Sequence, residues 1–233
     1  MNELLVNNIY PATEGEGVNL GLCQVFVRLQ GCEVGCVNCD SKETWSVKSG
    51  QKMTVAAILE KIPATTATPL KRVSITGGNP LMEMHKEGLL ELVLALKQDN
   101  YWVNIEASGD CHDHPVFDLV DFISFDLKTP STEVSHPSNI LENFVKKYSS
   151  KSQIKSIISD EADYQFTKKQ KVALEQASLT LPQWCLTPCY EPKEKFPQKR
   201  FQEIIEQNMQ DGAPFRVVCQ QHKFVYGPND KNS

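Results

Sequence analysis

Residues 23–41 read CQVFVRLQGCEVGCVNCDS and join two different patterns. The first seven, 23–29, alternate in polarity and are rich in β-forming side chains, so they predict a strand. The loop that follows carries Cys32, Cys36 and Cys39 within eight residues. A strand that leads into so dense a cysteine loop indicates a sheet protein whose chemistry lies where its strands end.

Strands and helices alternate along the rest of the chain. Strands are expected at residues 71–76, 101–106, 121–127, 153–159, 180–186 and 214–219. Helices are expected at 54–62, 86–98, 139–148, 161–177 and 199–209, with a short helical piece near 115–120. Strands separated by helices imply parallel pairing through right-handed crossovers. The predicted fold class is α/β, a partial or modified (β/α) barrel with a mainly parallel sheet.

Polar, glycine-rich and cysteine-containing segments follow the predicted strands. They are the cysteine loop, TGGNP, ASG, DLKTPS, SD, LTPC and QQHK. Loops that follow parallel strands share one face of a sheet or barrel, and that face carries the chemistry. We therefore expect these segments to line one cavity at the C-terminal face of the strands.

Length and composition limit the class of protein. The chain has 233 residues, 40% hydrophobic residues and a net charge of −5. It can bury a sizeable core, has no apolar run near the ~20 residues that cross a bilayer, and begins without a basic signal-like segment. We expect one cytoplasmic domain over residues 1–233, with 229–233 as a frayed tail, and no direct contact with nucleic acid or membrane.

Eight cysteines in a chain without an export signal favour metal ligation over disulfides. Structural zinc would need a fourth ligand, such as His85 or His112. A conventional iron–sulfur cluster would also need a fourth ligand, such as Cys185 or Cys189. Buried structural cysteines are the third alternative, and for the five cysteines outside the loop they are the preferred one.

Three cysteine ligands, one fewer than a conventional cluster needs, can themselves indicate a function. A [4Fe–4S] cluster held by three thiolates leaves one iron open to a substrate, as in a catalytic zinc site. The spacing C-x₃-C-x₂-C resembles the signature of the radical S-adenosylmethionine superfamily, in which the open iron binds S-adenosylmethionine and cleaves it to a 5′-deoxyadenosyl radical. The segment ITGGNP (75–80) resembles the Gly-Gly-Glu segment of that superfamily, with Asn79 in place of Glu.

Several blocks together resemble the 7-carboxy-7-deazaguanine synthase family within that superfamily. They are TEGEG (13–17), FVRLQGCEVGCVNCDSKETW (26–45), SITGGNP, IEASG, DLKTPS and QQHKFVYGP. The resemblance implies 6-carboxy-5,6,7,8-tetrahydropterin as substrate, hydrogen removal at C6, ring contraction and ammonia loss, in the pathway to queuosine and archaeosine. It also implies Mg²⁺, a flavodoxin- or ferredoxin-like electron donor and a homodimer.

The resemblance also assigns roles residue by residue. Substrate-binding positions would be Thr13, Glu14, Gly15, Arg28, Thr76, His222 and Pro228. Cofactor-binding positions would be Asn38, Asp40, Gly78, Asn79, Ser108, Asp126, Leu127, Lys128, Thr187 and Pro188. Cys32, Cys36 and Cys39 would bind the cluster and Ser41 the Mg²⁺. The chain departs from the family at Glu14, where Gln is common, at DLK in place of SPK, and at Thr187-Pro188 in place of Gln-Pro.

Two other functions remain open. A glycyl-radical activase shares C-x₃-C-x₂-C and often carries DLK, and it would place its radical on a partner protein. A zinc- or cluster-bearing binding module without catalysis is the alternative from a different class. Turnover of carboxytetrahydropterin separates the first from the family expectation, and anaerobic iron and sulfide analysis separates the second.

Overall fold

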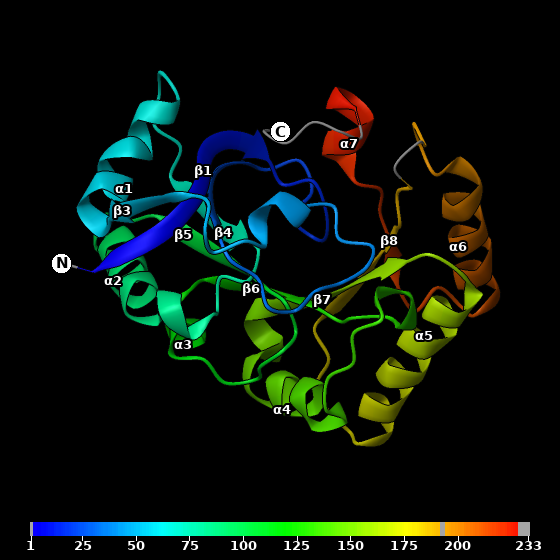
Figure 1. Ribbon diagram of the computed structural model, residues 1–233. Helices are drawn as coiled ribbons and strands as arrows, with labels where there is room; N and C mark the ends of the chain where they lie inside the picture. The colour runs from blue at the N-terminus through cyan, green and yellow to red at the C-terminus, as the bar shows by residue number, and fades with distance from the viewer. Residues whose placement is uncertain (1, 192–193, 228–233) are drawn as a thin grey trace.

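The computed structural model describes residues 2–191 and 194–227. Within them, nine strands form one sheet in the order β3-β1-β2-β4-β5-β6-β7-β8-β9 (Figure 1). The strands are β1 (Glu3–Thr13), β2 (Cys23–Leu29), β3 (Gln51–Thr54), β4 (Arg72–Gly77), β5 (Trp102–Ala107), β6 (Phe122–Asp126), β7 (Ser152–Ile158), β8 (Gln183–Pro188) and β9 (Arg216–Val217). From β2 to β9 every neighbouring pair is parallel. The predicted mainly parallel α/β sheet is confirmed.

Helices connect the parallel strands. They are α1 (Val55–Lys61), α2 (Lys86–Gln98), α3 (Pro115–Leu119), α4 (Ser138–Tyr148), α5 (Glu161–Gln176), α6 (Gln198–Gln210) and α7 (Gln221–Tyr226). Figure 1 shows α1 to α6 following one another around the outside of the sheet, with α7 apart from them near the C-terminus. None of the helices in the described part of the chain is long and apolar enough to cross a membrane.

Local sequence explains where the helices begin and which face they bury. Thr54 caps α1 by accepting a hydrogen bond from the amide of Ala57, and Asp160 caps α5 in the same way from Asp163. In α2, leucines at helical spacing pack on the apolar side of β4 and β5, in the main core cluster. One side of the sheet is therefore sealed by helices, which leaves the opposite, concave side for the site.

The concave side of the sheet is polar even where it is buried. Asn104 donates to Ser74 Oγ at 2.8 Å, and Gln153 donates to Ser124 Oγ at 2.7 Å. These side chains alternate with the apolar residues of β4 to β7 that face the helices. Because buried polar groups are costly unless they are hydrogen-bonded, this network supports the floor of a polar cavity.

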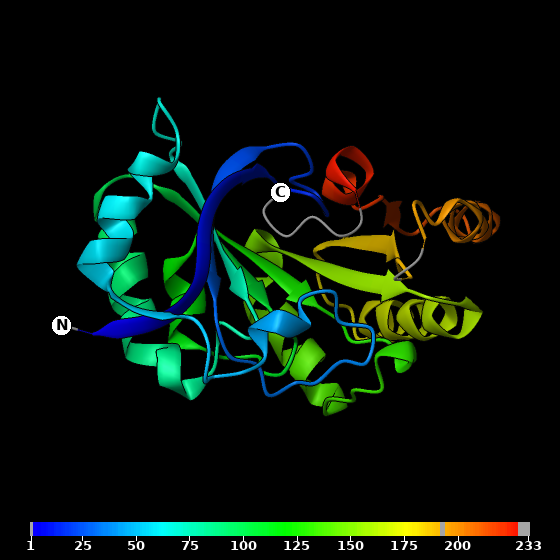
Figure 2. The ribbon, with the colours of Figure 1, turned by 45° about the horizontal axis from the view of Figure 1, so that its top comes forward.

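The sheet curves like a barrel but does not close, since β3 and β9 stand at its two described edges. The segment 14–22 runs through the gap between β1 and the C-terminal part of the chain (Figure 2). The amide of Val18 donates to Gln153 Oε1 at 2.7 Å, and the amide of Gln221 donates to the carbonyl of Gly15 at 2.9 Å. This bridging segment, residues 14–22, completes the cavity wall that the missing strands would otherwise form.

Four elements differ from the sequence expectations. β1 and β3 were not predicted, and they extend the sheet by antiparallel pairing beyond β2. The last parallel strand is only two residues long, within the predicted 214–219. Residues 221–226, which follow it, form α7 instead of a loop.

Candidate active site

A cavity of about 270 Å³ opens at the C-terminal ends of the parallel strands. The described residues that line it come from the bridging segment, the cysteine loop, the ends of β2 and β4 to β8, and α7. They include most of the predicted site positions: Thr13, Glu14, Gly15, Arg28, Cys36, Asn38, Cys39, Asp40, Ser41, Thr76, Gly78, Ser108, Asp126, Leu127, Lys128 and His222. Segments spread over some 200 residues therefore meet at one place, as the loop positions predicted.

The cysteine loop is fixed by hydrogen bonds at its base. The amide of Gly31 donates to Thr44 O at 2.6 Å, and the amide of Cys32 donates to Trp45 O at 3.2 Å. The buried Gln30 amide donates to the carbonyls of Glu43 and Ser46, both at 2.9 Å. These bonds hold the loop in place where it leaves β2, while its tip turns toward the cavity.

The two glycines at the end of β4 make room for that loop. A Cβ on Gly78 would lie 2.2 Å from Gly31 O and 2.9 Å from the Cβ of Cys32. A Cβ on Gly77, whose φ is +144°, would lie 2.2 Å from Leu29 O. Close approach of two backbone segments requires glycine here. The TGG sequence therefore seats the cysteine loop as well as facing the cavity.

The three loop cysteines lie in or beside the cavity. Cys36 and Cys39 line the cavity, Cys32 lies beside it, and all three are free thiols. Burial raises the pKa of the Cys36 and Cys39 thiols, so ligation would have to displace their protons. No group of three or more His, Cys, Asp or Glu residues among those described is arranged around one metal ion.

Of the two histidines named as a fourth zinc ligand, His85 already has a partner in the protein. His85 is fully buried, and its Nε2 lies 2.9 Å from the carbonyl oxygen of Gln30. Burial lowers the pKa of this imidazole, which keeps it neutral near pH 7. The ring therefore supports the end of β2 and does not point its Nε2 toward the loop cysteines.

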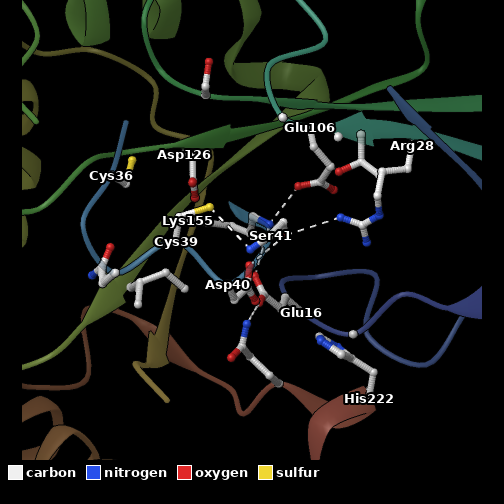
Figure 3. Close-up of a pocket in the computed structure, with 18 of the residues that line it drawn as sticks. Glu16, Arg28, Cys36, Cys39, Asp40, Ser41, Glu106, Asp126, Lys155 and His222 are labelled. Atoms are coloured by element: carbon white, nitrogen blue, oxygen red, sulfur yellow. Dashed lines mark hydrogen bonds and ion pairs between the residues drawn. The ribbon is translucent and has the colours of Figure 1, made fainter. Parts of the chain in front are cut away.

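Arg28 projects from β2 into the cavity, with a guanidinium that is available to an anion. One terminal nitrogen donates to the hydroxyl of Tyr10 at 2.5 Å, and the other lies 3.4 Å from Ser41 Oγ. Among the described residues, no carboxylate forms a salt bridge with it, and its Nε is buried without a partner. Figure 3 shows this guanidinium facing Ser41 and Glu106 across the cavity. A planar guanidinium that has no carboxylate partner in the protein can bind a ligand carboxylate through two parallel hydrogen bonds.

Lys155 of β7 lies between two carboxylates at the cavity floor (Figure 3). Its Nζ is 3.1 Å from Glu16 and 2.7 Å from Glu106, and its side chain is only 10% exposed. Burial opposes its charge, but the two carboxylates raise the pKa of Lys155 well above its usual value. Burial likewise opposes the charge of Glu16, and Lys155 nevertheless lowers its pKa. The sequence motifs did not predict a role for Glu16, Glu106 or Lys155.

Glu14 lies near that triad without a cation in contact. It is 6% exposed, and its Oε2 accepts a hydrogen bond of 2.8 Å from Gln24. Burial and repulsion from Glu106 raise the pKa of Glu14 to about 7. The side chain that replaces the common Gln of the family therefore titrates near neutrality.

Two further ion pairs line the cavity. Lys128 contacts Asp126 at 2.6 Å, and Lys223 of α7 contacts Asp40 of the cysteine loop at 2.6 Å. Although partial burial acts in the opposite direction, Lys223 lowers the pKa of Asp40 below its usual range. The second pair ties the C-terminal helix to the cluster loop.

His222 also belongs to this cavity. Its ring packs so closely on Gly15 that a Cβ there would lie 2.0 Å from its Nδ1. Burial lowers the pKa of His222, so its imidazole is neutral near pH 7. A side chain at Gly15 would therefore force the His222 ring to move.

Some predicted positions lie away from the cavity lining. Asn79 is buried and donates to Asp110 at 2.6 Å, while its oxygen accepts from the amide of Leu81. Thr187 and Pro188 lie at the end of β8, next to Cys189, which does line the cavity. Pro228 and the predicted tail 229–233 are outside the described residues.

Comparison with known proteins agrees with these features. Residues 13–109 match a family described as a 4Fe-4S single cluster domain. A relative from Pyrobaculum aerophilum named 7-carboxy-7-deazaguanine synthase is 38% identical over 133 residues. The matched part is 57% of this chain and 58% of that relative. One of the same name from Koribacter versatilis is 28% identical over 97% of this chain and 98% of its own length.

The fold comparison covers nearly the whole chain. A crystal structure of QueE from Escherichia coli superposes with a TM-score of 0.70, over 94% of this chain and 95% of that one, at 21% identity. At that identity the likeness establishes the fold, an open α/β barrel. This chain is thus similar in sequence to relatives named 7-carboxy-7-deazaguanine synthase, and its first half matches a 4Fe-4S single cluster domain.

Proposed function

We propose that this chain is a 7-carboxy-7-deazaguanine synthase, which converts 6-carboxy-5,6,7,8-tetrahydropterin to 7-carboxy-7-deazaguanine in 7-deazapurine biosynthesis. The observation that carries the proposal is that Cys36, Cys39 and Arg28 line the same cavity. A cluster-binding loop and a guanidinium that can accept a carboxylate are what a radical reaction on an acidic heterocycle needs.

The cluster would be held by Cys32, Cys36 and Cys39. With S-adenosylmethionine bound at the open iron, it would supply the electron that generates the hydrogen-abstracting radical. Cavity residues that would hold S-adenosylmethionine are Asn38, Asp40, Gly78, Ser108, Asp126, Leu127 and Lys128. Asn79, Thr187 and Pro188 would act from the layer behind them, through the backbone they support.

The substrate would lie between Arg28 and the bridging segment. Arg28 would hold its carboxylate, while Thr13, Glu14 and Gly15 would meet the polar edge of the pterin. The Glu16–Lys155–Glu106 triad offers fixed acceptors for ring N–H groups on the same side. Thr76 and His222 would fill the remaining walls and exclude water from the radical.

Ser41 would bind Mg²⁺ together with substrate oxygens. Its hydroxyl donates to Asp40 at 2.9 Å and lies near Arg28, so a hard cation there would face both the cluster loop and the substrate carboxylate. We further propose that residues 1–233 act as one domain in a cytoplasmic homodimer, reduced by a flavodoxin- or ferredoxin-like donor.

The direct test is turnover. Anaerobically reconstituted, reduced protein is incubated with S-adenosylmethionine, Mg²⁺ and 6-carboxytetrahydropterin, and the product is identified by its absorbance and mass. We expect the deazaguanine product, with S-adenosylmethionine regenerated. An intact cluster without this product, but with a radical placed on a partner protein, would instead support a glycyl-radical activase. About one zinc per chain and no sulfide would contradict both.

A further inference from the structure

The charged side chains that line the cavity do not balance. Within residues 2–191 and 194–227, four cationic side chains line it, on Arg28, Lys128, Lys155 and Lys223. The carboxylates that line it number five, on Glu14, Glu16, Asp40, Glu106 and Asp126. If all were ionised, the cavity would carry a net negative charge before any acidic ligand entered.

The contacts single out which carboxylate is in excess. Asp126 and Asp40 each have a lysine at 2.6 Å, and Glu16 and Glu106 share Lys155. The remaining one, Glu14, receives its hydrogen bond from an uncharged amide, that of Gln24. Its charge would therefore be the least compensated in the cavity, and a buried, unpaired charge is the most costly to maintain.

Gln24 provides a second, independent reason for a proton at this place. The side chain is fully buried on β2, and its Oε1 has no hydrogen-bond partner among the described residues. Its Nε2 already donates to Glu14 Oε2 at 2.8 Å. A carboxylic acid beside an amide can accept from the NH₂ group and donate to the oxygen, which would satisfy both ends of Gln24.

We propose that the cavity holds one proton on the Glu14–Gln24 pair at neutral pH, and that this proton makes the cavity selective for a carboxylate-bearing ligand. The proposal rests on the proposed function for the identity of that ligand. With Glu14 neutral, the four cations equal the four remaining carboxylates in number. Arg28 is the cation whose terminal nitrogens contact hydroxyl groups, so it is the one that can meet the incoming carboxylate. When Glu14 ionises, the same ligand meets a cavity with one more negative charge, so it binds more weakly.

The surroundings of Glu14 together raise the pKa of its carboxyl group. Burial and Glu106 of β5 favour the neutral acid, as does Glu16 of the bridging segment, while Lys155 of β7 and the Gln24 hydrogen bond favour the ion. Arg72 at the start of β4 also interacts with Glu14, and its guanidinium stacks on Trp102 at 3.5 Å from the ring centre. These opposing effects give Glu14 a pKa of about 7, so Glu14 loses its proton within the physiological pH range.

Ligand binding tests the proposal. The reconstituted, anaerobic protein and its Glu14→Gln variant are titrated with 6-carboxypterin, a stable oxidised analogue, by fluorescence quenching between pH 6.0 and 8.5. If only the protonated form binds well, the dissociation constant of the wild-type protein rises about 30-fold over this range, given a pKa of about 7. In Glu14→Gln that rise is absent. Ionisation of the pterin ring itself would occur equally in both proteins and cancels in the comparison.

A second variant tests the direction in which the pKa of Glu14 shifts. Glu106→Gln removes the largest negative neighbour of Glu14, so the pH at which affinity begins to fall should move lower. Equal pH dependence in wild type and Glu14→Gln would overturn the proposal, as would an unmoved midpoint in Glu106→Gln.

The proton can also be measured without any ligand, which separates this inference from the proposed function. The pKa of Glu14 is raised in the folded state from the ordinary 4.5 to about 7, so ionisation disfavours the fold. The wild-type apoprotein should lose stability relative to Glu14→Gln as pH rises from about 4.5 to 7, by urea unfolding. If 6-carboxypterin binds neither protein but this difference is seen, the substrate assignment fails and the proton stands. A stability difference independent of pH would contradict the proton.

Discussion

Gly78 lies against Cys32, so closely that a Cβ on the glycine would come within 2.9 Å of the cysteine Cβ. The contact joins the end of β4 to the base of the cysteine loop. It explains why a glycine stands in TGG even apart from any ligand, and it makes the position of Cys32, a proposed cluster ligand, depend on a neighbouring strand.

Gly78→Ala should therefore impair cluster assembly. The added methyl group would meet the Gly31 carbonyl at 2.2 Å, which is too close for any real Cβ contact, so the loop must move. We expect iron and sulfide content after anaerobic reconstitution to fall to less than about half of that of the wild type, with far-UV circular dichroism retained. Gly212→Ala, at a remote turn without neighbours within 4 Å, is the control: its φ of +81° makes alanine locally strained there, but the cysteine loop is untouched and the cluster should load normally. Equal loading of the two variants would show that the contact is dispensable.

Cys36→Ala should abolish the cluster altogether. Three thiolates are the minimum that leaves one iron open, and two do not hold a [4Fe–4S] cluster firmly. The brown absorbance and electron paramagnetic resonance signal of the reduced protein should both be lost. Cys23→Ala, at an exposed strand end, is the matched substitution and should keep them. A Cys36→Ala protein with a full cluster would remove Cys36 from the ligand set.

Arg28→Lys should raise KM for carboxytetrahydropterin more than it lowers kcat. Lysine keeps the charge but loses the bidentate fork, and hydrogen bonds to charged groups contribute about 1.5–3 kcal/mol. The expected loss in kcat/KM is about 10- to 100-fold, measured by product formation under anaerobic conditions. Arg216→Lys, on the edge strand β9, serves as the reference. An unchanged KM in Arg28→Lys would mean that the substrate carboxylate lies elsewhere.

Lys155→Met should destabilise the fold in a pH-dependent way. It leaves Glu16 and Glu106 without their shared cation, and removal of one member of a buried ion pair costs about 3–5 kcal/mol. Because Lys155 lowers the pKa of Glu16, its stabilising effect is present above the ordinary pKa of glutamate and is lost as pH falls through the lowered value. The deficit in urea unfolding should thus be large at pH 7 and shrink towards pH 4.

Lys146→Met provides the contrast for that experiment. Lys146 and Glu142 form a surface pair at 2.6 Å on α4, both about half exposed, and such pairs contribute less than about 0.5 kcal/mol. If the two substitutions lowered the free energy of unfolding equally, the triad would contribute no more to stability than a surface ion pair.

Strong periodicity made much of the fold predictable. The strand at 23–29 and the helix at 86–98 have the predicted bounds, because alternation and an apolar stripe are both unambiguous there. β1 was missed because ELLVNNIYPAT interrupts its apolar residues with two asparagines and Pro11, a sequence that an antiparallel strand tolerates. Only the pairing with β2 and β3 defines it.

The site divides in the same way. Residues in a motif, such as Cys36 and Arg28, were found because the motif itself is local. The Glu16–Lys155–Glu106 triad was not, because its members are up to 139 residues apart and meet only through the curvature of the sheet. A signal was present nonetheless: Glu106 and Lys155 are the only charged residues of β5 and β7, and charges in central strands are rarely buried without a partner.

The bridging segment has a consequence for the order in which the protein is made. Its Gly15 carbonyl and Glu16 carboxylate bond to Gln221 and Gln220, so the first and last parts of the described chain close the chamber together. A nascent polypeptide emerges N-terminal end first. The thiols of the loop are thus translated long before the walls that shelter them, and iron delivery to a finished chamber must wait until the ribosome has released α7.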